Sequence, residues 1–154
     1  MNDIFSVIAR NDRTGLAQIL ARGLDPNAKD DDGRTPLMHA VVGDQIEFVD
    51  LLIQSGADVN SQDNDGCSAL HFAAQEFRIA TAKLLLGHGA HVNACDRHGN
   101  TPLWRAVFNS RGRGDIISLL LLYGADRRIK NESGKTPVDL ANTIGNYNIK
   151  QFLN

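Results

Sequence analysis

The strongest constraint on the fold is internal repetition with a period of 33 residues. The segment Thr35–Ala40 (TPLMHA) returns 33 residues later at Ser68–Ala73, after another 33 at Thr101–Ala106, and after 35 at Thr136–Ala141. Two series of glycines keep the same spacing, at positions 23, 56, 89 and 124 and at positions 33, 66, 99 and 134. A repeat of roughly 20 to 50 residues indicates a stack of supersecondary units.

Each recurring position has a physical role in a helical hairpin. Thr35 is suited to cap a helix whose first residue is Pro36, because proline has no N–H to leave unpaired there. Ala40 is small enough to let neighbouring helices approach closely. A second helix follows with the helically spaced apolar stripe of segment 46–53, and Gly56 ends it in a left-handed conformation. Segments such as 63–66 (DNDG) are typical of turns.

This pattern resembles the ankyrin repeat, whose period is about 33 residues and whose marker is Thr-Pro-Leu-His-x-Ala. The resemblance covers essentially the whole chain and implies an all-α ankyrin-repeat solenoid of helix-turn-helix units with projecting hairpin loops. The chain departs from the marker in places. Ser68-Ala69 replaces Thr-Pro, and only His71 keeps the marker histidine, with Met38, Trp104 and Asp139 in its place elsewhere.

We expect a single domain over residues 1–154. The predicted units are an N-terminal capping repeat at about 1–29, full repeats at 30–62, 63–95 and 96–130, and a C-terminal capping repeat at 131–154. A repeat cannot bury its apolar face alone, so terminal units need polar outer surfaces. With a cap at each end, the protein is expected to be complete and monomeric.

Composition and charge exclude several classes of protein. The chain is 42% hydrophobic and 22% charged with a net charge of −2, which favours neither nucleic acid nor membrane as a partner. The longest apolar run, near Ile116–Tyr123, is far shorter than the ~20 residues that span a bilayer. There is no basic, apolar leader, so Cys67 and Cys95 are interpreted as free thiols of a cytoplasmic protein.

Metal and catalytic signatures are missing from the sequence. The five histidines and two cysteines form no CxxC or HExxH pattern. If Gly33 stood at the sixth position of a calcium loop, Ala28 and His39 would occupy positions that need acidic ligands. No Walker loop, GxSxG or GxGxxG motif is present. We therefore expect no enzyme activity, no metal and no cofactor.

The resemblance implies that a partner protein is bound by the hairpin tips and the inner helices, which together form a concave surface. Repeat phase selects surface positions on this side of the stack, to which the third repeat adds its own irregularities. The predicted protein-binding residues are Asp31, Asp32, Arg34, Asn64, Asp65, Cys67, Gln75, Glu76, Arg97, His98, Asn100, Trp104, Arg105, Phe108, Asn109, Arg111 and Arg113. The alternative for any one of them is an ordinary solvated loop residue.

The third repeat breaks the pattern most. Trp104 stands at the marker-histidine position, Arg105 where an apolar residue is usual, and Phe108 at a position expected to be exposed. Aromatic and arginine residues are favoured binding anchors, although Trp104 could instead pack on a neighbouring repeat. Two extra residues in segment 109–115 predict a longer, mobile loop carrying Arg111 and Arg113, either a contact loop or a tolerated insertion.

Charge is distributed unevenly along the stack. Residues 1–96 hold 14 acidic and 7 basic side chains, whereas residues 97–154 hold 4 acidic and 9 basic ones. Sequence order is spatial order in a solenoid, so one end should be acidic and the other basic. Such polarity would orient a charged partner, although it can also arise by chance.

Protein binding is the function that the sequence favours. More narrowly, the chain resembles small stand-alone bacterial ankyrin-repeat proteins, some of which serve as immunity proteins that neutralise a partner toxin. The alternative is a general adaptor or a regulatory, inhibitory subunit. An enzyme or ligand sensor would need a pocket with convergent polar groups. Nucleic-acid binding by segment 105–135 is disfavoured, because Asp115, Asp126 and Glu132 dilute its charge.

Overall fold

A computed structural model describes residues 3–144 and 149–153 of the chain, which form ten α-helices. The predicted terminal units also contain residues 1, 2, 145–148 and 154, which lie outside the described part. The helices are α1 (Ile4–Ala9), α2 (Arg13–Ala21), α3 (Pro36–Val42), α4 (Ile46–Gln54), α5 (Ala69–Gln75), α6 (Ile79–Gly87), α7 (Pro102–Asn109), α8 (Asp115–Leu122), α9 (Pro137–Thr143) and α10 (Lys150–Leu153).

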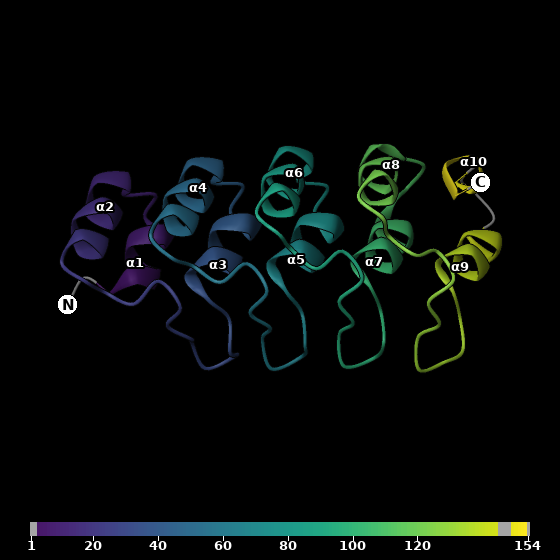
Figure 1. The fold of residues 1–154 in the computed structure, drawn as a ribbon, viewed down its shortest axis with the longest axis horizontal. Helices are drawn as coiled ribbons and strands as arrows, with labels where there is room; N and C mark the ends of the chain where they lie inside the picture. The colour runs from purple at the N-terminus through teal and green to yellow at the C-terminus, as the bar shows by residue number, and fades with distance from the viewer. Residues whose placement is uncertain (1–2, 145–148, 154) are drawn as a thin grey trace.

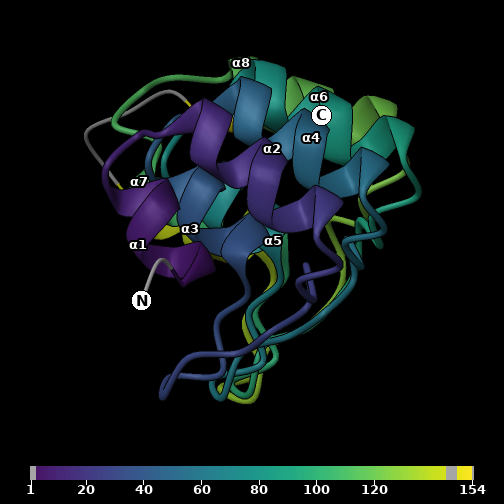
Figure 2. The ribbon, with the colours of Figure 1, turned by 90° about the vertical axis from the view of Figure 1, so that its left-hand side faces the viewer.

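The helices are arranged in two rows with a row of loops beneath them (Figure 1). The inner row contains α1, α3, α5, α7 and α9, and each of these helices contacts the next one in the row. The outer row contains α2, α4, α6, α8 and α10, which stack in the same way. Seen along the stack, the loops project together on one side of the inner row (Figure 2). The predicted all-α solenoid is confirmed.

The starts of the inner helices follow the predicted capping chemistry. The side chains of Thr35, Thr101 and Thr136 each accept a hydrogen bond from a backbone N–H three residues on, and a proline follows each of them. The marker alanines Ala40, Ala73 and Ala106 have no exposed surface. Close packing of the inner row therefore depends on small residues at the expected positions.

Each projecting hairpin is stabilised by an Asp or Asn side chain at the same position of its turn. Asp63 Oδ1 accepts hydrogen bonds from the backbone N–H groups of Asp65, at 2.9 Å, and Cys67, at 2.8 Å. Asp30, Asp96 and Asn131 make equivalent pairs of bonds in the other hairpins. Gly66 has φ +76°, and a Cβ there would lie 2.9 Å from the next hairpin's Arg97 nitrogen, so this turn requires glycine. The predicted turn chemistry is confirmed.

Asparagines connect each unit to the next. Asn60 donates from Nδ2 to the Gly89 carbonyl at 3.1 Å and accepts from the His91 N–H at 2.8 Å. Asn27 and Asn93 make the same two contacts one repeat earlier and one repeat later. The ends of the outer helices are therefore linked by a ladder of side-chain bonds, in addition to apolar packing.

The longer interhelical loop of the third repeat is present between α7 and α8. Arg111 and Gly112 have positive φ values of 46° and 87°, which end the helical path. The loop contacts the preceding repeat, because the Arg113 guanidinium carbon lies 3.9 Å from the centre of the Phe77 ring. It therefore extends along the stack as well as outward.

Candidate protein-binding surface

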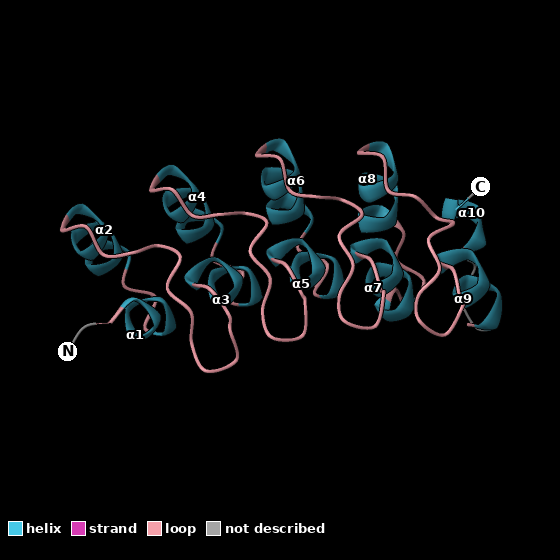
Figure 3. Ribbon diagram, turned by 60° about the horizontal axis from the view of Figure 1, so that its bottom comes forward, coloured by secondary structure: helices cyan, strands magenta, loops and turns pink. Residues whose placement is uncertain are grey.

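The tips of the hairpins form a continuous ridge. Neighbouring tips are joined by backbone hydrogen bonds from Asn64 N–H to the Asp32 carbonyl, from Arg97 N–H to the Asp65 carbonyl, and from Glu132 N–H to the His98 carbonyl. The loops that carry them lie side by side in Figure 3. Side chains on the ridge are exposed at positions 31, 32, 64, 65, 97 and 98. The structure thus brings six predicted residues into one surface strip.

An aromatic pair stands beside this ridge on α7. The Trp104 and Phe108 rings are stacked with centroids 5.3 Å apart and planes at 13°. Phe108 is 59% exposed, whereas Trp104 is half-buried. One helical turn separates the two residues, so the helix itself places them on one face. A large exposed apolar surface of this kind is suited to bury against a partner.

Trp104 also lines a pocket of about 390 Å³ between the third repeat and the last hairpin. Leu140 and Thr143 of α9 form part of its wall. Polar residues of the two neighbouring hairpins complete it, namely His98, Asn100, Asn131, Glu132, Ser133 and Lys135. Three predicted residues, Trp104, His98 and Asn100, are thereby brought together at the corner between the hairpins and the inner helices.

A second pocket of about 400 Å³ lies between the interhelical turns of the second and third repeats. It gathers five more predicted residues, Gln75, Glu76, Asn109, Arg111 and Arg113, together with Phe77 and Arg78. Arg78 is paired with Asp44 at 3.0 Å. The rim of this pocket is strongly polar and contains three guanidinium groups.

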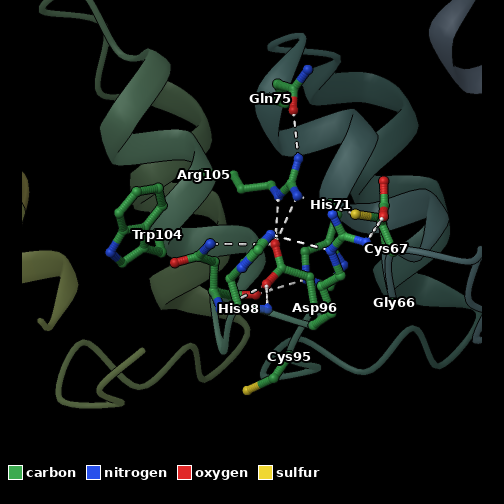
Figure 4. Close-up of polar contacts among 12 residues, drawn as sticks. Gly66, Cys67, His71, Gln75, Cys95, Asp96, His98, Trp104 and Arg105 are labelled. Carbon is green, nitrogen blue, oxygen red and sulfur yellow. Dashed lines mark hydrogen bonds and ion pairs between the residues drawn. The ribbon is translucent and has the colours of Figure 1, made fainter. Parts of the chain in front are cut away.

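Arg105 makes contacts within the protein. Its Nη2 lies 2.7 Å from Asp96 Oδ2 and 3.1 Å from Cys67 Sγ, and its Nη1 donates to Gln75 Oε1 at 2.8 Å (Figure 4). Burial raises the pKa of Asp96, but hydrogen bonds from Arg105 and from two backbone N–H groups outweigh it, so the pKa is lowered. Arg105 therefore compensates a buried carboxylate, with 22% of its side chain exposed.

The prediction that Cys67 is a surface position is wrong. Its side chain is buried, with 3% exposure, because it follows the Asp63 turn into the core beneath Arg105. Burial raises the pKa of its thiol to about 11, so the thiol stays protonated at neutral pH. Both cysteines are free, and Cys95 is exposed on the hairpin (Figure 4). Arg34, predicted from the same surface set, is half-buried and lies over the Phe72 ring.

His71 shows what the marker residue does in this fold. Its Nδ1 accepts a hydrogen bond from the Ser68 N–H at 3.0 Å, so the proton is on Nε2, which donates to the Asn100 carbonyl at 3.1 Å. The second bond ties the second repeat to the next hairpin. Burial lowers the pKa of His71 to about 4, which keeps the ring neutral. His71 is therefore a structural residue.

Among residues 3–144 and 149–153, no three His, Cys, Asp or Glu side chains are grouped so that they could hold a metal ion. Over the same residues, no helix has the length and hydropathy needed to cross a bilayer.

Some pocket residues were not identified from the sequence. Asn131, Leu140 and Thr143 line the Trp104 pocket, yet the first reads as a turn residue and the other two as ordinary helix positions. Phe77 was also missed, and it holds the Arg113 side chain. The sequence signal that could have located this pocket was Trp104 itself. An indole ring at the marker-histidine position is larger than the imidazole it replaces, so the packing around it has to differ from that in the other repeats.

Comparison with known proteins identifies the family. The family model described as ankyrin repeats (3 copies) matches residues 5–96, 52–131 and 79–154. The matched segments overlap, so the repeat boundaries given above stay a prediction. No curated protein matches the chain significantly. Ankyrin repeats generally mediate protein–protein interaction and are typically non-enzymatic. The matched segments together span nearly the whole sequence, and the chain belongs to the ankyrin repeat family.

Proposed function

We propose that this protein binds one partner protein through its concave side, with the binding centre at the third repeat. The observation that carries the proposal is the stacked pair Trp104 and Phe108 beside an open pocket, because exposed aromatic anchors next to a cavity are typical of binding hot spots. Arg97 extends the same surface along the hairpin ridge, where it pairs with Asp65 at 2.8 Å.

Capture of partners from the native host tests this proposal. Tagged wild-type protein is compared with the double variant Trp104→Ala, Arg97→Ala, after circular dichroism has shown that the variant folds. We expect one stoichiometric partner that the variant loses. A partner that the variant retains would exclude the surface around Trp104 and Arg97 as the binding centre. Retention would direct attention to the acidic end or to the Arg111–Arg113 loop, and capture of nothing would contradict protein binding.

A narrower proposal is that the partner is a toxin and this protein its immunity factor. It is supported by the resemblance to small bacterial ankyrin-repeat proteins and by a surface that can block a partner without chemistry of its own. Co-expression with the product of the neighbouring gene tests it. Relief of toxicity together with a stable complex is expected. Absence of both would exclude this role for that gene pair and leave the broader binding function in place.

The second candidate is an adaptor or regulatory subunit. It is favoured by the length of the ridge, which offers several hairpin tips to more than one partner. The capture experiment separates the two roles. Many partners held weakly and released by a moderate salt wash would support an adaptor, whereas one partner retained through the wash would support a dedicated inhibitor.

We further infer that the protein acts as a monomer in the cytosol. An exposed free thiol at Cys95 suits a reducing compartment. Exposed polar residues cover the outer surfaces of the terminal units, including Arg10 and Gln18 at one end and Asn142 and Gln151 at the other. Light scattering of the purified protein at several concentrations would show a constant mass of about 16.8 kDa.

A further inference from the structure

We propose that the Trp104 pocket receives an apolar side chain from an acidic segment of the partner. This inference rests on the proposed function and specifies the chemistry of what is bound. Two neighbouring junctions between repeats differ in this protein. His71 closes the first, and Trp104 lines the second.

The junction after the second repeat is closed. His71 donates from Nε2 to the carbonyl of Asn100, a residue of the next hairpin. The ring is buried, so the inner helix and the hairpin are in direct contact.

The junction after the third repeat differs because Trp104 occupies the position of His71. The corresponding carbonyls, those of Asn100 and Lys135, each accept a bond from a backbone N–H of their own hairpin, and His71 adds a second bond to the Asn100 carbonyl. Trp104 Nε1 is buried and has no hydrogen-bond partner among the described residues. The indole points away from the Arg105 cluster (Figure 4), and the 390 Å³ pocket lies on its open side.

The walls of this pocket favour an apolar occupant. The indole and Leu140 supply apolar surface to the wall of the pocket, which Thr143 also lines. The volume is sufficient for one large side chain, such as phenylalanine or leucine. Burying that side chain would remove apolar area from water on both partners, which is the main driving force at the centre of an interface.

Charges around the pocket favour an acidic flank on the partner. Lys135 lies on the pocket wall, and Arg97 is exposed on the neighbouring hairpin tip, where it pairs with the exposed Asp65 at 2.8 Å. Glu132 is the one acidic residue on the wall, and residues 97–154 together carry nine basic and four acidic side chains. A segment with carboxylates on either side of its apolar residue is therefore attracted and oriented, whereas a basic segment is repelled.

Three short peptides test the proposal directly. Trp104 is the single tryptophan, so the protein has one indole N–H resonance, which reports on the pocket alone. The probe is the blocked peptide acetyl-Glu-Asp-Phe-Glu-Asp-amide. Its controls have glycine in place of phenylalanine, or lysine in place of all four acidic residues. We expect a saturable shift of the indole resonance by the acidic phenylalanine peptide with a Kd of about 1 mM or below.

Each control peptide should bind at least about tenfold more weakly, because each lacks one of the two recognised features. The proposal is overturned if the acidic phenylalanine peptide leaves the indole resonance unmoved. Equal shifts by all three peptides would overturn it as well, since they would show that neither the apolar residue nor the charge is recognised.

The variant Trp104→His is the matched control on the protein side. Histidine restores the marker residue. We expect it to bond to the Lys135 carbonyl as His71 bonds to the Asn100 carbonyl, so that the fold is kept and the pocket closes. Backbone amide resonances of residues 131–135 then report on binding, and the acidic phenylalanine peptide should no longer shift them. Undiminished shifts in the variant would show that the peptide binds elsewhere.

The captured partner separates this proposal from the broader one. The partner could bind Trp104→His with wild-type affinity but lose affinity for the variant Arg97→Ala, Phe108→Ala. That result would mean that the partner uses the concave side but not the Trp104 pocket. Loss of affinity for both variants supports both proposals. Unchanged affinity for both variants contradicts both of them.

Discussion

At the residue scale, the position of the marker histidine decides whether a junction between repeats is closed or open. His71 has a neutral ring and closes one junction with a hydrogen bond to the Asn100 carbonyl. Trp104 at the next equivalent position has an Nε1 donor without a partner among the described residues and a pocket beside it. The two residues therefore differ in hydrogen bonding and in burial, and this difference separates a structural role from a proposed binding role.

The neutral state of His71 predicts a pH dependence of stability. Its pKa is lowered from 6.5 to about 4 in the folded protein, so below pH 6.5 the unfolded chain binds a proton that the folded chain does not. Its contribution is therefore complete above pH 6.5 and is lost as the pH falls toward 4, by about 3 kcal/mol.

The variant His71→Gln tests this dependence. Urea unfolding between pH 7 and pH 4 should show a smaller decrease in the free energy of unfolding for this variant than for the wild type. His88→Gln, at an exposed histidine, is the matched control and should keep the wild-type slope. Equal slopes for the wild type and His71→Gln would contradict a buried neutral imidazole.

Arg105 allows a second prediction at this scale. Arg105→Met leaves Asp96 buried with its two backbone N–H donors but without its cation, so we expect a loss of about 2 kcal/mol in the free energy of unfolding at pH 7. The folded pKa of Asp96 is lowered, so the difference should shrink as the pH falls below 3.8.

Arg128→Met is the control for this substitution. It breaks an exposed pair with Asp126 and should leave the unfolding midpoint unchanged. If Arg105→Met unfolded at the wild-type denaturant concentration, the Asp96 pair would have no structural role. Arg105 would then be free to act as a binding anchor, as the sequence suggested.

At the scale of elements, asparagine bonds between units contribute to cooperativity. Asn60→Ala removes two bonds to the next unit, and we expect a loss of about 1–2 kcal/mol measured by urea unfolding. Asn60→Asp keeps the acceptor for the His91 N–H but loses the donor to the Gly89 carbonyl, so its loss should be intermediate. Equal losses for both variants would mean that the bond from the His91 N–H, which Asn60→Asp keeps, contributes nothing to stability.

Most elements could be predicted because each is set by local chemistry that recurs with the period. Thr35, Pro36 and Gly56 specify a helix start and a helix end by backbone requirements alone. The site was less predictable, because exposure depends on what packs above a residue. Cys67 has the same repeat phase as Arg34, Asn100 and Lys135, which are half-buried or exposed, but the guanidinium of Arg105, 38 residues later, covers it. The Trp104 pocket likewise depends on α9 and the last hairpin, which no local pattern relates to α7.

In the whole molecule, the linear stacking of the repeats separates the excess of negative charge from the excess of positive charge. Segment 1–96, which has an excess of acidic side chains, and segment 97–154, which has an excess of basic ones, occupy opposite ends of the stack in Figure 1. A partner attracted to the basic end would be steered by long-range forces. We therefore expect its association rate to fall severalfold as the ionic strength rises from about 0.05 M to 0.3 M, with little change in the dissociation rate. A salt-independent association rate would show that the polarity has no part in recognition.

We propose that the concave side of the third repeat binds a partner protein, and the affinity of the captured partner for two matched variants decides whether it does. Calorimetry should compare the wild type with a concave-side variant, Trp104→Ala, Phe108→Ala, and with an outer-row variant, Ile79→Ala, Leu122→Ala, whose residues are also exposed and apolar. We expect a loss of affinity of about 100-fold or more for the first variant and wild-type affinity for the second. Loss of affinity in the outer-row variant alone would contradict this proposal and place the binding surface on the outer helices.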